Sequence, residues 1–249
     1  MRLSCLDDGH RVRARLFLRM TSRDAPDVVR MLLYRPEFFA RPLLALTVAA
    51  MRGPSYWTVG EREDMARRVA ERHRCAFCLE SHTEMTRLVS HDPAETRAVA
   101  DAPPHAVREA ARVTLVWEVV NRLGNAFGFA LRGDQVHTGT KALNRFGYRF
   151  PGFLLAGGTN AGHEDPVEDL RHAVFTAPAV TDPALRRSAV TGDLAEPWSS
   201  YTALVRDASY RIVDADVDRL LVAHTEDEVF EMTVAAAVGA ALVDYDADQ

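Results

Sequence analysis

Two cysteines, one histidine and one glutamate are grouped within a short stretch of this chain, from Glu63 to His82. Cys75 and Cys78 form a Cys-x-x-Cys pair, His82 follows four residues later, and Glu63 precedes Cys75 by twelve residues. Two thiols, an imidazole and a carboxylate can form a redox centre with its own proton relay. The group constrains the fold because its chemistry requires all four side chains at one place.

Helical spacing can bring three of the four side chains together. If residues 75–82 are helical, Cys75, Cys78 and His82 lie on one face. Cys75 is then in the first turn, where free N–H groups and the helix dipole favour a thiolate. Cys78 and His82 are an i, i+4 pair, so the imidazole can accept the thiol proton. The dipole thus makes Cys75 the more acidic thiol, whereas the contact with His82 favours Cys78 as the attacking one.

Glu63 joins the group only if the chain reverses. On one straight helix it would lie ~18 Å from Cys75, at a rise of 1.5 Å per residue. The polar run 71–74 permits a turn, after which the two segments would pack as a helical hairpin. Without that turn, Glu63 is a solvated carboxylate that pairs with Arg67 four residues later.

The remainder of the chain also has helical signals. A long helix is expected after Pro103-Pro104, continuing to Phe127, and a second from about Glu37 to Met51, kinked or split by Pro42. Residues 128–166 are expected to be irregular with short helices. Further helix starts are predicted at Asp24-Pro26, Thr58–Glu61, Asp92–Glu95, Asp182-Pro183, Asp214 and Thr225–Glu228. No segment has strand-like alternation, so the sequence predicts an all-α fold.

One all-helical domain over residues 1–249 accounts for this pattern. Its motif core covers about 57–130, and a C-terminal helical part covers about 166–249. The last helix contains many small residues, which suit either a seam between helices or subunits or a tightly packed internal helix. Both interpretations remain open from the sequence.

Composition excludes several classes of function. The net charge of −5 shows no basic block, which argues against a nucleic-acid partner. The longest apolar runs, 42–51 and 234–243, are about half the ~20 residues that span a bilayer. Three cysteines are too few for a disulfide-stapled secreted domain. We expect a cytoplasmic protein without a membrane partner, in which a Cys-x-x-Cys is catalytic or metal-binding.

The motif resembles that of the alkylhydroperoxidase D / carboxymuconolactone decarboxylase superfamily. Its Glu63, Cys75-x-x-Cys78 and His82 spacing carries the resemblance, and the run 78–82 (Cys-Leu-Glu-Ser-His) is especially similar. The specific match covers roughly Trp57 to His91. Further segments are similar to the peroxidase-related branch of that superfamily, namely 34–39, 51–54, 121–123 and 147–151. Residues after about 165 contribute little, apart from the final helix.

The resemblance implies an AhpD-like all-helical fold that assembles into dimers, trimers or hexamers, with a hairpin carrying the motif. It also implies a thiol peroxidase acting on organic hydroperoxides. Cys78 would attack the peroxide and Cys75 would resolve the sulfenic acid as a disulfide, with His82 and Glu63 relaying protons. An external dithiol, such as a lipoyl- or thioredoxin-type protein, would restore the thiols, and no metal or other cofactor is needed. The chain departs from the best-known members at Phe77, where they have a second histidine.

Three alternatives to peroxidase activity remain. Zinc could bind Cys75, Cys78 and His82 with Cys5 or His73 as the fourth ligand. The chain could also catalyse another small-molecule, biosynthetic reaction, or act as a redox-sensing protein without turnover. Cys5 itself is expected in a mobile N-terminal segment as an incidental thiol, and His73 and His91 are expected to be exposed.

Overall fold

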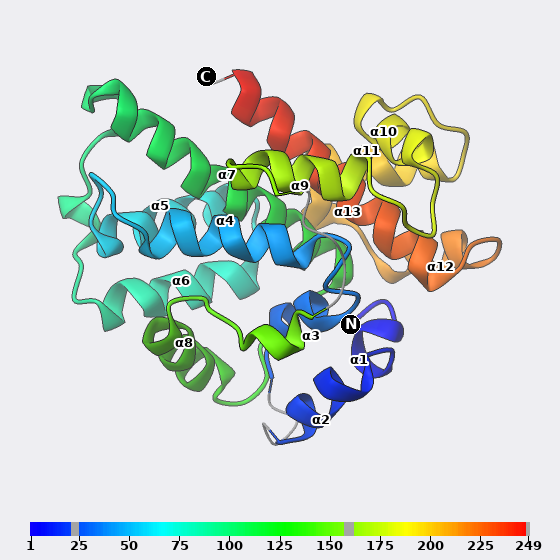
Figure 1. The fold of residues 1–249 in the computed structure, drawn as a ribbon, viewed down its shortest axis with the longest axis horizontal. Coiled ribbons are helices and arrows are strands. Elements are labelled where there is room, and N and C mark those ends of the chain that lie inside the picture. Colours follow the sequence, from blue (N-terminus) through cyan, green and yellow to red (C-terminus); the bar gives the residue numbers. More distant parts are fainter. Residues whose placement is uncertain (21–24, 157–161, 248–249) are drawn as a thin grey trace.

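The computed structural model describes residues 1–20, 25–156 and 162–247, and this part of the chain is all-α, without strands. The prediction of an all-α fold is therefore confirmed for it. Of the helix start expected at Asp24-Pro26, Asp24 lies outside the described residues and Pro26 is the N-cap of α3 (Asp27–Leu33). The α-helices are α1 (Cys5–Asp8), α2 (Val12–Met20), α3 (Asp27–Leu33), α4 (Ala40–Arg52), α5 (Val59–Arg72), α6 (Ala76–Leu88), α7 (Pro104–Phe127), α8 (Gln135–Phe146), α9 (Pro166–Phe175), α10 (Pro183–Thr191), α11 (Trp198–Ala208), α12 (Asp214–Leu221) and α13 (Glu226–Ala247) (Figure 1).

Short 3₁₀ turns fill several connections between the α-helices. They are η1 (Pro93–Glu95), η2 (Val99–Asp101), η3 (Gly152–Leu154) and η4 (Ser209–Arg211). The capping signal at Asp92 therefore starts only a single 3₁₀ turn, and no α-helix follows it directly. Its carboxylate accepts a hydrogen bond from the Ala94 amide at 2.9 Å.

Helices α5 and α6 form the hairpin that Glu63 requires. The last turn of α5 closes with two backbone hydrogen bonds, from Cys75 N to Ala70 O and from Arg74 N to Glu71 O, both 3.0 Å. This 6→1 and 5→2 pattern is a Schellman motif, which needs a left-handed residue after the helix. Arg74 supplies it with φ of 52°. Cys75 thus ends the turn of α5 and is also the N-cap of α6.

The other predicted starts were of mixed accuracy. Thr58 and Glu61 form the expected capping box at the start of α5. Pro42 neither kinks nor splits a helix, because α4 begins only at Ala40 and proline fits the first turn. Helix α8 is longer than the short helices expected between residues 128 and 166. The starts of α9 and α11 were not predicted individually, although both helices lie within residues 166–249, which were expected to be helical.

Helix α13 is an internal helix. Its residues 229–239 are buried, and α7, α9, α10 and α11 pack around it. Small side chains let these helices approach closely: a Cβ on Gly239 would lie 2.3 Å from Val190 Cγ2. Of the two interpretations of the last helix, the structure supports the tightly packed internal one.

The N-terminal segment is fixed to α13, contrary to the expectation for Cys5. The Glu226 carboxylate accepts hydrogen bonds from the backbone N–H groups of Ser4 and Cys5, both at 2.8 Å. Cys5 is half-buried in α1. Within the described residues, no helix is long and apolar enough to cross a membrane.

Candidate active site

The two thiols of the motif lie side by side at the start of α6. Cys75 and Cys78 are both buried and not disulfide-bonded. Gly124 allows α7 to pack closely against Cys75, because a Cβ at Gly124 would lie 3.3 Å from the Cys75 sulfur. The sequence analysis did not single out this glycine.

The surroundings shift the pKa values of the two thiols in opposite directions. Hydrogen bonding to the Cys78 thiol, together with the nearby Cys78 and Phe77 amides, lowers the pKa of Cys75 against the opposing effect of burial. The same contact with Cys75, reinforced by burial, raises the pKa of Cys78 well above its ordinary value. The pair therefore releases its first proton as a Cys75 thiolate that accepts the Cys78 S–H, in the direction expected from the helix N-terminus.

His82 is held by Glu63 across the hairpin. Its Nδ1 lies 2.8 Å from Glu63 Oε2, and both side chains are buried. An ionised carboxylate can only accept hydrogen bonds, so Nδ1 of His82 donates to Glu63, which leaves Nε2 for proton transfer. The Trp117 ring packs edge to face against the imidazole, with the ring centroids 4.0 Å apart. The described residues include no hydrogen bond between His82 and Cys78.

Glu63 has further partners from distant segments. The Arg52 guanidinium is 2.7 Å from Oε1, and the Tyr148 hydroxyl donates to both carboxylate oxygens, at 3.0 and 3.1 Å. Burial opposes ionisation of Glu63, but His82 and Arg52 outweigh it, so the pKa of Glu63 is lowered. Burial and the Glu63 charge raise the pKa of Tyr148 well above its ordinary value.

Sequence reasoning assigned no catalytic role to Arg52, Tyr148 or Trp117. The first two lie in segments quoted for their resemblance to the peroxidase-related branch, which was the available signal. Tyr148 follows Gly147, and both have a left-handed backbone, with φ of 64° and 57°. This turn after α8 directs the tyrosine inward, and such a conformation is uncommon for a non-glycine residue.

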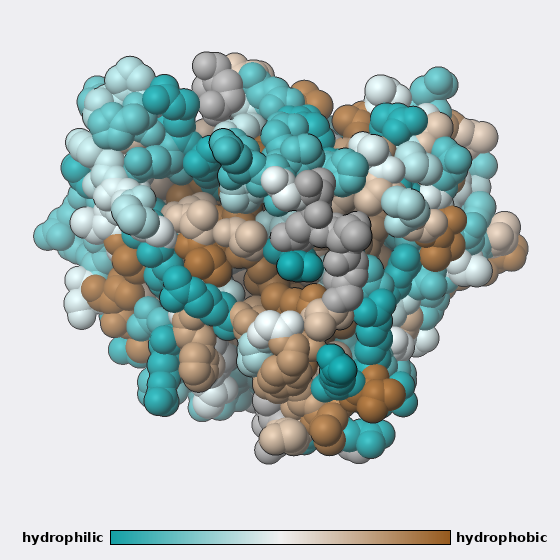
Figure 2. Space-filling view, viewed as in Figure 1, coloured by the Kyte–Doolittle hydropathy of each residue, from teal (hydrophilic) through white to brown (hydrophobic). Residues whose placement is uncertain are grey.

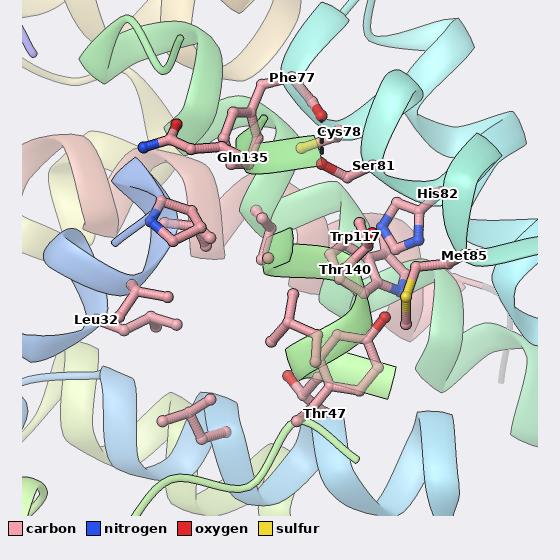
Figure 3. Close-up of a pocket in the computed structure, with 18 of the residues that line it drawn as sticks. Leu32, Thr47, Phe77, Cys78, Ser81, His82, Met85, Trp117, Gln135 and Thr140 are labelled. Carbon is pink, nitrogen blue, oxygen red and sulfur yellow. Dashed lines mark hydrogen bonds between the residues drawn. The ribbon is translucent and has the colours of Figure 1, made fainter. Parts of the chain in front are cut away.

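Cys78 and His82 line an apolar cavity of about 70 Å³. Helices α3, α4, α6, α7 and α8 contribute its wall, and Figure 3 shows Cys78, Ser81, His82 and Met85 on the α6 side facing Leu32 of α3. Cys75 does not belong to the lining and lies behind Cys78. This space holds several water molecules and is smaller than a typical ligand site.

Phe77 occupies the place where the best-known members of the superfamily that the motif resembles have a histidine. Its ring lines the cavity and packs edge to face against Phe129, with ring centroids 5.4 Å apart. This position therefore supplies apolar wall and no proton relay.

His73 and His91 are less exposed than expected. His73 Nε2 lies 2.6 Å from the buried Glu118 carboxylate, and His91 Nε2 lies 2.8 Å from Thr96 Oγ1. No three His, Cys, Asp or Glu side chains of the described residues are arranged to hold a metal ion. The zinc alternative, which needed His73 or Cys5 as a ligand, gains no support.

Comparisons with protein-family models, curated proteins and solved structures gave no match for this chain.

Proposed function

We propose that this chain is a thiol peroxidase of the alkylhydroperoxidase D type that reduces organic hydroperoxides through a Cys75–Cys78 dithiol/disulfide cycle. The observation that carries the proposal is the position of Cys78 on the wall of an apolar cavity, beside a histidine held by a buried carboxylate. The adjoining Cys75 gives an oxidised Cys78 a partner within the same chain. The resemblance of the hairpin motif to the alkylhydroperoxidase D superfamily supports the same proposal.

Cys78 lines the cavity, whereas Cys75 is the thiol with the lowered pKa. The first step therefore needs a proton transfer between the two sulfurs. Cys78 passes its proton to Cys75 and, as a thiolate, attacks the outer oxygen of the hydroperoxide. The O–O bond breaks, Cys78 becomes a sulfenic acid, and the departing alkoxide takes the proton from Cys75 and leaves as an alcohol.

The second step closes the disulfide. The Cys75 thiolate attacks the Cys78 sulfur, and the departing hydroxide becomes water with a proton delivered through His82. Glu63 orients the imidazole and stabilises its protonated form during this transfer. An external dithiol then reduces the disulfide to two thiols and is itself oxidised. A lipoyl- or thioredoxin-type protein is the proposed donor, and a homo-oligomer the proposed assembly.

The test is turnover of cumene hydroperoxide with dithiothreitol as the reductant. Cys78→Ser and Cys75→Ser each should reduce hydroperoxide consumption to the background rate, because one removes the nucleophile and the other the resolving thiol. Cys5→Ser is the matched control and should leave the rate unchanged, since Cys5 lies in α1 outside the cavity.

The same experiment separates the alternatives. A dithiol that oxidises without hydroperoxide turnover would indicate a redox sensor or a different small-molecule reaction. Stoichiometric zinc with unreactive thiols would contradict the peroxidase proposal.

A further inference from the structure

Helix α2 carries apolar side chains on its outer face. Val12, Leu16 and Met20 follow one another at intervals of four residues, so they form one stripe along the helix. Their exposed fractions are 76%, 60% and 76%. Ala14 and Leu18 on the inner face are buried instead. An amphipathic helix normally hides its apolar stripe, but no described part of the chain covers this outer one.

Arginines flank the apolar stripe on both sides. At 3.6 residues per turn, Arg13 lies on one side of it, and Arg15 and Arg19 lie on the other. All three side chains are exposed, and none of them forms an ion pair with another described residue. The segment 11–20 contains four arginines and no acidic residue, although the whole chain has a net charge of −5. The net charge therefore conceals a local cationic cluster.

Acidic side chains near α2 do not neutralise this cluster. Glu37 is paired with Arg11 at 2.5 Å. Asp7 and Asp8 border a groove beside the end of α2, and Asp7 is already paired with Arg30 at 3.2 Å. Asp8 is thus the one nearby carboxylate of the described residues that is left to balance three arginines, and the outer face of α2 has a positive local charge.

Phe153 of η3 extends the apolar surface. Its side chain is 56% exposed, and it lines a surface groove together with Val12 and Arg13. Figure 2 shows apolar and polar side chains side by side at the lower edge of the molecule, where Figure 1 places α2. The surface thus combines exposed apolar groups with cations that have no partner in the described chain.

A second copy of this face is a poor occupant of it. Helix α2 has 9 residues, so its outer face is about 14 Å long and about 11 Å wide. This footprint is less than a quarter of the ~800 Å² that each partner buries in a stable complex. Two copies related by symmetry would also bring their arginines together, and like charges repel.

Nucleic acid fits the charge of the surface but leaves the apolar stripe unexplained. Contacts to a phosphate backbone use cationic and polar side chains. Large apolar side chains flanked by arginines are typical of a helix that lies in the plane of a membrane surface. Anionic head groups would match the arginines, and the acyl boundary below them would receive the apolar stripe.

We propose that the outer face of α2, together with Phe153, docks on an anionic lipid membrane. The apolar stripe enters the boundary between head groups and acyl chains, and the flanking arginines contact the lipid phosphates. The sequence predicted no membrane partner because no apolar run is long enough to span a bilayer, but a helix in the interface needs no such run. This inference is independent of the proposed function.

Sedimentation with sucrose-loaded vesicles tests the proposal. Phosphatidylcholine vesicles that contain about 30% phosphatidylglycerol should bind the protein about tenfold more strongly than phosphatidylcholine alone, at about 50 mM NaCl. Raising the salt to about 500 mM should remove most of this difference, because salt screens the arginines. Equal binding to the two kinds of vesicle, or no binding to either, would overturn the proposal.

Charge reversal locates the cationic part of the surface. The double variant Arg13→Glu, Arg19→Glu should bind the anionic vesicles about tenfold more weakly. The matched control is Arg108→Glu, Arg211→Glu, which changes the net charge equally at two exposed arginines outside α2. The control should stay within about twofold of the unsubstituted protein. Equal losses in the two double variants would show that net charge alone governs binding and would contradict the assigned surface.

The apolar stripe is tested without changing the charge. Leu16→Ser should lower binding to the anionic vesicles about threefold, because it removes a side chain that enters the membrane. Val222→Ser is the matched control, since Val222 is 86% exposed at the end of α12, and it should leave binding unchanged. These residues are exposed, so both variants should fold.

Two outcomes would assign the surface to another partner and overturn the lipid proposal. Unchanged vesicle binding in Leu16→Ser, with binding of a short DNA duplex that depends on Arg13 and Arg19, would indicate nucleic acid. A smaller assembly of Leu16→Ser in sedimentation velocity, with no vesicle binding by the unsubstituted protein, would show that α2 joins two copies of the chain.

Discussion

Two carboxylate–histidine pairs join α5 and its C-cap to α6 and α7 at similar distances, one through Nδ1 of His82 and the other through Nε2 of His73. Glu63 lies 2.8 Å from His82, and Glu118 lies 2.6 Å from His73. Arginine accompanies each pair, Arg52 at Glu63 and Arg122 at Glu118. In both, the carboxylate is almost entirely withdrawn from solvent.

Their surroundings differ. The Glu63 pair meets an apolar cavity with a thiol on its wall, whereas the Glu118 pair borders a polar groove formed by α7, the segment from α11 to η4, and α13. No cysteine is among the described residues that line that groove. A buried carboxylate–histidine pair by itself therefore does not mark an active site in this chain, and we propose catalysis for the pair that lies near a nucleophile.

The largest expected effect is a loss of kcat/KM that separates the Glu63 pair from the Glu118 pair. Glu63→Gln should lower kcat/KM for cumene hydroperoxide by about 100-fold, because His82 loses the carboxylate that orients it. Glu118→Gln should stay within about threefold of the unsubstituted protein, since it contacts no reacting group. Equal losses in two folded variants would remove the distinction between the pairs.

Both pairs should stabilise the fold through their ionised carboxylates, and unfolding measurements should show this for each. Burial opposes ionisation of Glu118, but His73 and the arginines outweigh it and lower the pKa of Glu118 from 4.5 to about 2. The carboxylate then stabilises the fold by about 3 kcal/mol above pH 4.5, a contribution lost as pH falls from about 4.5 to 2.

Urea unfolding measures this contribution. Glu118→Gln should be less stable than the unsubstituted protein at pH 7, with the difference shrinking towards pH 2. The lowered pKa of Glu63 predicts the same direction for Glu63→Gln. A difference that does not change with pH would contradict the ion pairing.

A smaller effect is expected from Tyr148→Phe. The change removes the hydroxyl that donates to Glu63, at a cost of about 1 kcal/mol in unfolding free energy. Turnover should also fall, by about three- to tenfold, because Glu63 loses a partner that fixes it. Tyr201→Phe is the matched control, since it removes a buried hydrogen bond to Thr233 outside the cavity. It should lose similar stability and keep full turnover.

The smallest effect is expected at Phe77. Phe77→His should raise turnover by about two- to fivefold, because a second imidazole beside Cys78 can accept its proton. Phe77→Leu, which keeps the wall apolar, should not raise it. Equal rates in the two variants would show that proton transfer at this place does not limit the reaction.

Local signals in the sequence predicted the all-α class and the hairpin. The Thr58 capping box and the polar run 71–74 each depend on neighbouring residues, and neighbours are visible in a sequence. Pro42 was misjudged because the start of α4 has no side-chain cap that would have marked it. The start of α11 was missed for the same reason, since Pro197 precedes it without a capping hydrogen bond.

The site was predicted only as far as its local spacing extends. Cys75, Cys78 and His82 follow from one helix start, and Glu63 from the hairpin. Arg52 and Tyr148 could not be assigned, because tertiary packing alone brings α4 and the turn after α8 to the Glu63 carboxylate.

The most direct test of the account is the intact mass of the protein after one equivalent of cumene hydroperoxide, with dimedone present to trap sulfenic acid. The unsubstituted protein should lose two hydrogens, and dithiothreitol should reverse the loss. Cys75→Ser should carry one dimedone adduct at Cys78, and Cys78→Ser should carry none. An adduct at Cys75 in the Cys78→Ser protein, or no mass change in any of the three, would contradict the proposed cycle.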